Sequence, residues 1–145
     1  MPKNCDFIGK LREVGLRPTK QRVEMCEVLF NREKTFHFTI NDLVKMISKE
    51  MNEKISLATV YNTVHAFKKK GYLKEISIDS HKSYFDTNTS AHHHFFDEDT
   101  NELIDCDEND IDPVNIKKNI TGKKINSVEV LIKVASDNQN QKKFK

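Results

Sequence analysis

Apolar residues in the first part of the chain recur at the three- and four-residue spacing of an amphipathic helix. This pattern predicts helices over residues 6–14, 19–30 and 39–51. Gly15 is expected to stop the first helix, and Thr19 and Thr39 to cap the second and third. Asp42, three residues after Thr39, stands where a capping box has Glu or Gln. We expect all three helices to be structural.

A fourth helix, predicted over residues 56–70 and ended by Gly71, has apolar residues on one face only. Its other face is polar and ends in a lysine run. Short hydrogen-bonding side chains can reach base edges, an aromatic ring can pack on a thymine methyl group, and lysines can neutralise phosphates. We therefore expect a recognition helix for DNA. The predicted DNA-contacting residues are Arg17, Thr19, Thr59, Tyr61, Asn62, Thr63, Lys68, Lys69 and Lys82.

Residues 73–78 and 82–86 alternate as strands around a polar turn, which predicts a β-hairpin. Helices followed by a hairpin form a winged helix-turn-helix. The predicted fold class is thus α+β, with a winged helix-turn-helix DNA-binding domain followed by a small α/β dimerisation domain. Its boundaries are a DNA-binding domain over 1–86, a hinge over 87–91, a dimerisation and sensing domain over 92–135 and a disordered tail over 136–145.

An ordinary helical domain with a solvated fourth helix is the alternative to this prediction. In either case His65 and His81 are interpreted as surface residues, because neither falls in an apolar stripe. The wing-tip residue Lys82 contacts a phosphate only in the DNA-binding interpretation.

Charge divides the chain into two unlike halves. Residues 1–86 carry 16 Lys and Arg against 11 Asp and Glu, a net charge of +5, whereas residues 87–145 carry 8 against 11, a net charge of −3. A basic first half is compatible with a polyanionic partner. Residues 91–112 hold nine carboxylates, three histidines and no Lys or Arg, a composition that favours cations.

Composition also excludes several classes of protein. No apolar run approaches the roughly 20 residues of a membrane-spanning helix, so a membrane protein is not expected. The N-terminus has no apolar stretch typical of a secretory signal, and three scattered cysteines form no disulfide framework. We therefore expect a cytoplasmic protein.

The histidine triplet His92, His93 and His94 opens the second half. Residues 92–97 and 102–106 are predicted to pair as two strands around a tight turn. In this register His94 faces Asp105, and because side chains alternate, His92 lies on the same side while His93 points away. An exposed loop is the alternative. The pairing instead predicts half of a metal site.

Two imidazoles and a carboxylate suit Fe(II), Mn(II) or Zn(II). Asp86, at the end of the wing, and His37, between the second and third helices, could complete the ligand shell from the first domain. An ion that joins two domains fixes their relative angle and so acts as a switch.

The rest of the second half is predicted to contain a short helix over residues 110–120 and a strand over 127–134. A three-stranded sheet with one covering helix is too small to stand alone, so we expect a homodimer. A two-fold axis would place two recognition helices about one DNA turn apart, as a palindromic operator requires.

Three segments resemble the ferric uptake regulator superfamily, and the resemblance covers nearly the whole chain. These segments are Leu16–Arg22, Ser56–Thr63 and Ser90–Phe96. Within the superfamily, Tyr84–Asn88, the histidine triplet and Glu102–Asp105 are most similar to the iron response regulator branch.

The resemblance implies a five-ligand regulatory metal site, whose positions fall on His37, Asp86, His92, His94 and Asp105. It also implies a haem response through the triplet, with His92, His93 and His94 as candidates. As the branch is described, the protein is mostly a repressor of iron and haem metabolism genes. It binds DNA when iron is scarce and is released or lost when haem accumulates.

The chain departs from the family pattern at its cysteines. Many members hold a structural zinc with two Cys-x-x-Cys pairs, but Asp97 and Thr100 occupy the first pair's positions and the chain has only three cysteines. No tetrathiolate zinc can form, so packing alone must hold the dimer. Some relatives carry a Cys-Pro haem motif, whereas Cys5 is followed by Asp6, so haem at Cys5 is not expected.

An additional metal site found in the superfamily is also incomplete here. His93 and Asp112 could serve in it, but Asn126 stands at a position often occupied by His.

Three functions are weighed. The leading one is a dimeric regulator that responds to haem or iron status. The alternative is a divalent-metal or peroxide-sensing regulator of the same superfamily without haem dependence. A metallohydrolase is disfavoured, because a catalytic metal needs an open coordination position and a substrate cleft, and an enzyme has no need of the polar fourth helix. We therefore do not expect an enzyme.

Overall fold

The computed structural model describes residues 6–137 and forms two compact units, Met1–Thr89 and Ser90–Lys145. The division falls within the stretch predicted as a hinge. Cys5 and residues 138–145, most of the predicted tail, lie outside the described residues. No helix in the described part of the chain is long and apolar enough to cross a membrane.

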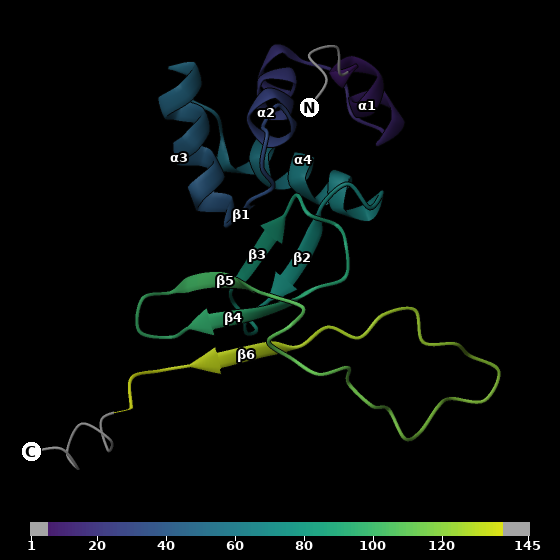
Figure 1. Cartoon of the computed structure of the whole chain (residues 1–145). Coiled ribbons are helices and arrows are strands. Elements are labelled where there is room, and N and C mark those ends of the chain that lie inside the picture. The colour runs from purple at the N-terminus through teal and green to yellow at the C-terminus, as the bar shows by residue number, and fades with distance from the viewer. Residues whose placement is uncertain (1–5, 138–145) are drawn as a thin grey trace, which may run out of the picture. The chain divides into compact units, whose positions relative to one another are not determined.

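Four helices make up most of the first unit (Figure 1). They are α1 (Phe7–Glu13), α2 (Lys20–Phe30), α3 (Ile40–Met51) and α4 (Leu57–Lys69). The four predicted helices are confirmed, each shorter by one or two residues. Gly15 and Gly71 follow the helices that they were predicted to end, with φ angles of 80° and 83° that favour glycine.

Side-chain caps define where each helix begins. Asp6, Thr19, Thr39 and Ser56 each accept a hydrogen bond from the backbone N–H three residues further on. The predicted capping box is confirmed, since Asp42 also accepts a hydrogen bond from the backbone N–H of Thr39. These caps satisfy N–H groups that a helix cannot pair internally.

The core of the first unit lies between the helices and one face of its sheet. Each helix contributes buried side chains at helical spacing, including Leu11, Leu29, Leu43, Ile47, Val60, Val64 and Phe67. The ring of Phe67 packs edge-on against Phe30, with centroids 5.3 Å apart, and against Tyr72 at 6.0 Å. This packing fixes α4 against α2 and leaves its opposite face in solvent.

A three-stranded antiparallel sheet completes the first unit, with β3 (Ser83–Asp86) between β1 (His37–Phe38) and β2 (Lys74–Ser77). The predicted hairpin is β2 and β3. β1 was not predicted, because two residues are too short to show a strand alternation. It places His37 opposite Asp86 and Phe38 opposite Phe85.

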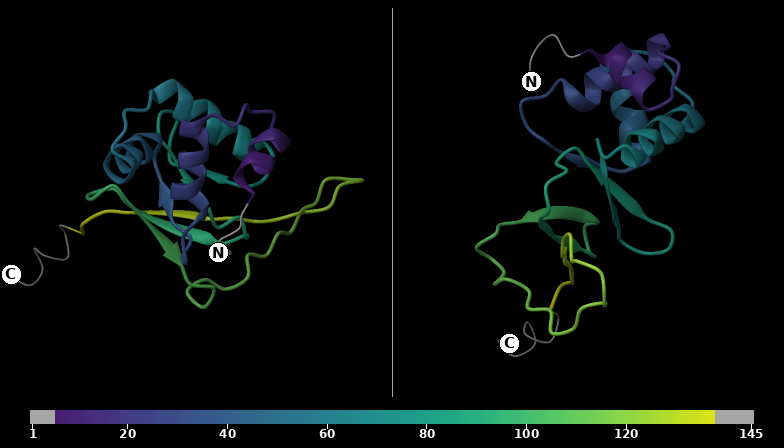
Figure 2. Two further views of the ribbon diagram at one scale, coloured as in Figure 1. Left: turned by 90° about the horizontal axis from the view of Figure 1, so that it is seen from above. Right: turned by 90° about the vertical axis from the view of Figure 1, so that its right-hand side faces the viewer.

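The second unit holds another three-stranded sheet, visible in Figure 2. Its strands are β4 (His93–Asp97), β5 (Glu102–Cys106) and β6 (Leu131–Val134), in the order β5-β4-β6. β4 and β5 are antiparallel in the predicted register, with Asp97 opposite Glu102 and His94 opposite Asp105. β6 runs parallel to β4, which no sequence pattern indicated.

The helix predicted over residues 110–120 is wrong. Residues 107–130 run as a loop without helix or strand (Figure 1). Residues 112–127 of this loop are all exposed. Pro113 and several β-branched residues and asparagines lower the helix propensity, and a short helix needs a packed face to be stable. The strand predicted over 127–134 is limited to its last four residues.

Candidate metal and DNA-reading sites

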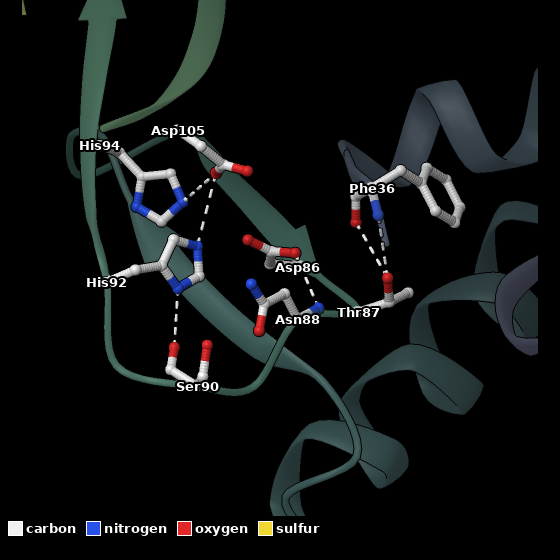
Figure 3. Close-up of polar contacts among 8 residues, drawn as sticks. All are labelled: Phe36, Asp86, Thr87, Asn88, Ser90, His92, His94 and Asp105. Atoms are coloured by element: carbon white, nitrogen blue, oxygen red, sulfur yellow. Dashed lines mark hydrogen bonds and ion pairs between the residues drawn. The ribbon is translucent and has the colours of Figure 1, made fainter. Parts of the chain in front are cut away.

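His92 and His94 converge on one carboxylate in the second unit (Figure 3). The Nε2 atom of His94 lies 3.1 Å from Oδ1 of Asp105, and Nε2 of His92 lies 3.4 Å from the same oxygen. Donors bound at about 2.1 Å to one ion are roughly 3.0–3.4 Å apart in octahedral or tetrahedral geometry. The three side chains therefore fit one face of a metal site.

The ring orientation of His92 indicates which of its nitrogens faces the carboxylate as an acceptor. Nδ1 of His92 lies 2.7 Å from the carbonyl oxygen of Ser90. A carbonyl can only accept, so Nδ1 carries the proton, and in the neutral ring Nε2 presents a lone pair to Asp105. The acceptor Nε2 is the kind of atom through which a neutral imidazole binds a metal ion, and it lies 3.4 Å from Oδ1 of Asp105.

Burial differs sharply across this half-site. The side chain of His94 is 4% exposed and that of His92 is 14% exposed, whereas that of Asp105 is 55% exposed. The two imidazoles are thus sheltered, and the carboxylate borders solvent.

His93 lies on the other side of β4, as predicted. Its Nδ1 accepts a hydrogen bond from the backbone N–H of Val130 at 2.9 Å, which ties β4 to the residue before β6. His93 and its register partner Cys106 line a cavity of about 630 Å³. Burial raises the pKa of the Cys106 thiol, and Asp110 and Asp107 raise it further. The neutral thiol is therefore favoured over the thiolate, which is the form that binds metals.

His37 and Asp86 are neighbours within the first unit, as register partners on β1 and β3. The Asp86 carboxylate is 1% exposed and accepts a hydrogen bond from the backbone N–H of Asn88 at 2.8 Å (Figure 3). Thr87 ties the same strand end to Phe36, whose N–H donates to the Thr87 hydroxyl at 3.0 Å. The end of β3 is thus held firmly beside β1.

The predicted DNA contacts on the polar face of α4 differ in their exposure and in whether they are already paired with another side chain. Tyr61 is 52% exposed, and Asn62 and Lys69 are exposed. Lys68 is instead paired with Glu75, with Nζ 2.5 Å from Oε1. Burial raises the pKa of Glu75, but hydrogen bonds from Lys68 and Ser83 outweigh it, so the pKa lies below its usual value. The ammonium of Lys68 is therefore already engaged by Glu75, so we expect it to contribute less than Lys69 to binding a phosphate.

One predicted DNA contact is wrong. Thr63 is fully buried, and its hydroxyl donates to the carbonyl oxygen of Thr59 at 2.7 Å. It faces the core because it lies three residues after Val60, on the apolar side of the helix. Thr59 is half-buried, and its hydroxyl accepts a hydrogen bond from Ser56.

The remaining predicted DNA contacts lie outside α4. Arg17 is exposed, and its carbonyl accepts a hydrogen bond from the guanidinium of Arg22. Thr19 caps α2, which accounts for its side chain without DNA. The ammonium of Lys82 lies over the ring of Tyr84, 5.5 Å from its centroid.

The interpretation of His65 as a surface residue is wrong as well. Its ring is half-buried between Tyr61, with centroids 4.1 Å apart, and Phe85, with centroids 5.4 Å apart. The spacing of four residues from Tyr61 to His65 is the sequence signal that could have indicated the first contact. The contact with β3 had no local signal.

Comparison with known proteins gives matches over most of the chain. The model of the Ferric uptake regulator family matches residues 13–134. The peroxide operon regulator of Bacillus subtilis (strain 168) is 32% identical over 121 residues, which cover 83% of this chain and 81% of that protein.

Solved structures share the fold at lower identity. The Vibrio cholerae ferric uptake regulator has a TM-score of 0.67 at 21% identity, covering 90% of this chain and 100% of that chain. A ferric uptake regulator from Pseudomonas aeruginosa, solved with manganese, has a TM-score of 0.64 at 22% identity, covering 92% and 99%. The predicted fold class, an N-terminal DNA-binding domain with a C-terminal dimerisation domain, is confirmed by the family match together with these structures.

Proposed function

Because this chain belongs to the ferric uptake regulator family, whose members are dimeric DNA-binding transcription regulators rather than enzymes, we propose that its affinity for DNA is set by a divalent metal ion. The observation that carries the proposal is the convergence of His92 and His94 on one oxygen of Asp105. Two imidazole nitrogens and one carboxylate oxygen form a donor set that suits Mn(II), Fe(II) or Zn(II).

We propose that His37 and Asp86 supply the two further ligands. The family resemblance supports this assignment, and the pairing of both residues on β1 and β3 gives the ion two donors already held side by side. When bound, the ion supplies positive charge and fixed coordination directions. His37, Asp86, His92, His94 and Asp105 would hold the ion, and the contact of Nδ1 with the Ser90 carbonyl would keep Nε2 of His92 available as a donor.

Peroxide is the signal that the named relatives support, through the peroxide operon regulator described above. This supports the alternative of a metal- or peroxide-sensing regulator over a haem-specific one. The two alternatives also use different residues. A metal ion needs His92 and His94, whereas haem could also be ligated at His93, which lines the cavity of about 630 Å³ together with His92.

One experiment tests the function and separates these signals. The affinity of the purified protein for a duplex selected from a random library is measured at fixed salt in five forms: apo, Mn(II)-loaded, Fe(II)-loaded, Fe(II)-loaded after hydrogen peroxide, and hemin-treated. We expect metal to raise the affinity and peroxide to lower it again in the Fe(II)-loaded form, because Fe(II) is readily oxidised. Equal affinity in the apo and metal-loaded forms would refute the proposal. A saturable Soret band together with a change in DNA affinity would restore the haem interpretation.

The exposed face of α4 leads to a second test, in which two kinds of contact are separated. Tyr61→Ala should reduce the preference for the selected duplex over a scrambled one by about 1–3 kcal/mol, because an aromatic contact with a base reads sequence. Lys69→Ala should weaken binding to both duplexes alike and flatten the plot of log affinity against log salt by about 0.9, the value for one phosphate.

Lys68→Ala is the matched control for Lys69→Ala. Its ion pair with Glu75 already engages the ammonium, so its loss should change the salt slope less. Equal loss of sequence preference in all three variants would contradict the assignment of α4 as the recognition helix.

A further inference from the structure

The ring of Tyr61 is half-exposed on a helix surface, and a neighbouring ring packs against it. That ring belongs to His65, one helical turn further on, with centroids 4.1 Å apart and planes inclined by 40°. A free tyrosine on a helix exchanges among rotamers, and ordering it costs conformational entropy when DNA binds. A ring in contact with one face restricts that exchange before binding.

His65 itself packs against a residue of the first sheet. Its ring meets Phe85 edge-on, with centroids 5.4 Å apart and planes inclined by 83°. Phe85 is 2% exposed in the central strand of the first sheet, between Phe38 of β1 and Glu75 of β2. The rings of Phe38 and Phe85 are stacked, with centroids 6.0 Å apart. His65 therefore packs against β3, the central strand of the sheet, which is paired on both sides.

We propose that His65 is a positioning residue for DNA recognition, which braces the Tyr61 ring against β3 in the orientation that reads the duplex. The inference rests on the proposed function, in which Tyr61 contacts DNA. In this arrangement His65 need not touch DNA. It lowers the cost of binding by holding Tyr61 in place, as pre-organised side chains do at other interfaces.

The contacts separate this inference from a phosphate contact by His65 itself. An imidazole that served the DNA directly would need its ring edge in solvent, whereas this ring is half-buried between two aromatic neighbours. An uncharged planar ring at position 65 should then keep Tyr61 in place as well as the imidazole does. His65→Phe keeps the ring and removes every hydrogen-bonding group, so it distinguishes bracing from a polar contact.

The test uses the full chain loaded with Mn(II) and a duplex selected by the unaltered protein. His65→Ala should lower the affinity about 3- to 10-fold, in line with the strength of one aromatic contact. His65→Phe should restore it to within about 2-fold. In the Tyr61→Ala background, His65→Ala should have no further effect on the affinity, because His65 acts only through the Tyr61 ring.

Four results would overturn the inference. One is an unchanged affinity in His65→Ala, and another is an equal additional loss in the Tyr61→Ala background. The third is failure of His65→Phe to restore binding while its thermal midpoint stays at the value of the unaltered protein. Binding that is lost in all His65 variants in step with the thermal midpoint would mark His65 as a stability residue only, and would also overturn it.

A spectroscopic readout does not depend on DNA. The ring protons of Tyr61 should lose their ring-current shift in His65→Ala and in His65→Leu, which fills the space without an aromatic ring. Unchanged Tyr61 resonances would refute the contact. If the unaltered protein selects no duplex at all, the proposed function itself fails, and that result differs from one in which only the His65 variants behave unexpectedly.

Discussion

Replacing His94 with alanine should weaken Mn(II) binding more than about 100-fold and abolish the dependence of DNA affinity on the metal. Loss of a group that merely supports a ligand costs about 10- to 100-fold, and His94 is itself a proposed donor. Its side chain is the most buried of the half-site, so water can replace its nitrogen only poorly. Isothermal titration with Mn(II) measures the first effect, and a gel-shift or anisotropy titration with and without Mn(II) measures the second.

Two other histidines provide controls for this variant. His81 is exposed in the wing turn, so His81→Ala should leave both measurements unchanged. His93→Ala removes the bond to Val130, so it should lower the thermal midpoint while leaving Mn(II) affinity within a few-fold. Mn(II) affinity that falls equally in His93→Ala and His94→Ala would contradict the division of the triplet between two faces.

Phe67→Ala should cost about 3–5 kcal/mol in the free energy of unfolding of the first unit, enough to unfold many proteins of this size. Its ring is fully buried and packs edge-on against Phe30 and Tyr72, so the substitution leaves a cavity under α4. DNA binding should also be lost in this variant, because α4 is then no longer held in one position by packing against α2.

Urea unfolding followed by far-ultraviolet circular dichroism measures this loss. The described helices all lie in the first unit, so the helical signal reports on that unit. The chain contains no Trp, which rules out the usual fluorescence probe. Leu57→Ala, at an exposed position of the same helix, should change the free energy of unfolding by less than about 0.5 kcal/mol. A loss below about 1 kcal/mol for Phe67→Ala would disagree with the packing described.

Local signals predicted most of the fold correctly. Caps such as Thr39 and stops such as Gly71 act within a few residues, so helix ends can be found from sequence alone. The half-site was predictable for a related reason, since a short turn sets the register that brings His94 opposite Asp105.

Features that depend on distant contacts could not be predicted. β1 is defined by its pairing with β3, some 48 positions away in the chain, and β6 by its parallel pairing with β4. Thr63 looked polar in the sequence, yet its hydroxyl bonds to the carbonyl of the preceding helical turn and is tolerated in the core. The predicted helix over 110–120 had apolar residues but no surface to pack against, and packing decides whether a short helix forms.

The exposure of Asp105 determines how the site would meet the ions around it. The Asp105 carboxylate would be the part of the proposed site that an incoming ion meets first, because it is 55% exposed whereas the imidazoles of His92 and His94 are sheltered. Metal uptake would then begin at a single negative charge that borders solvent.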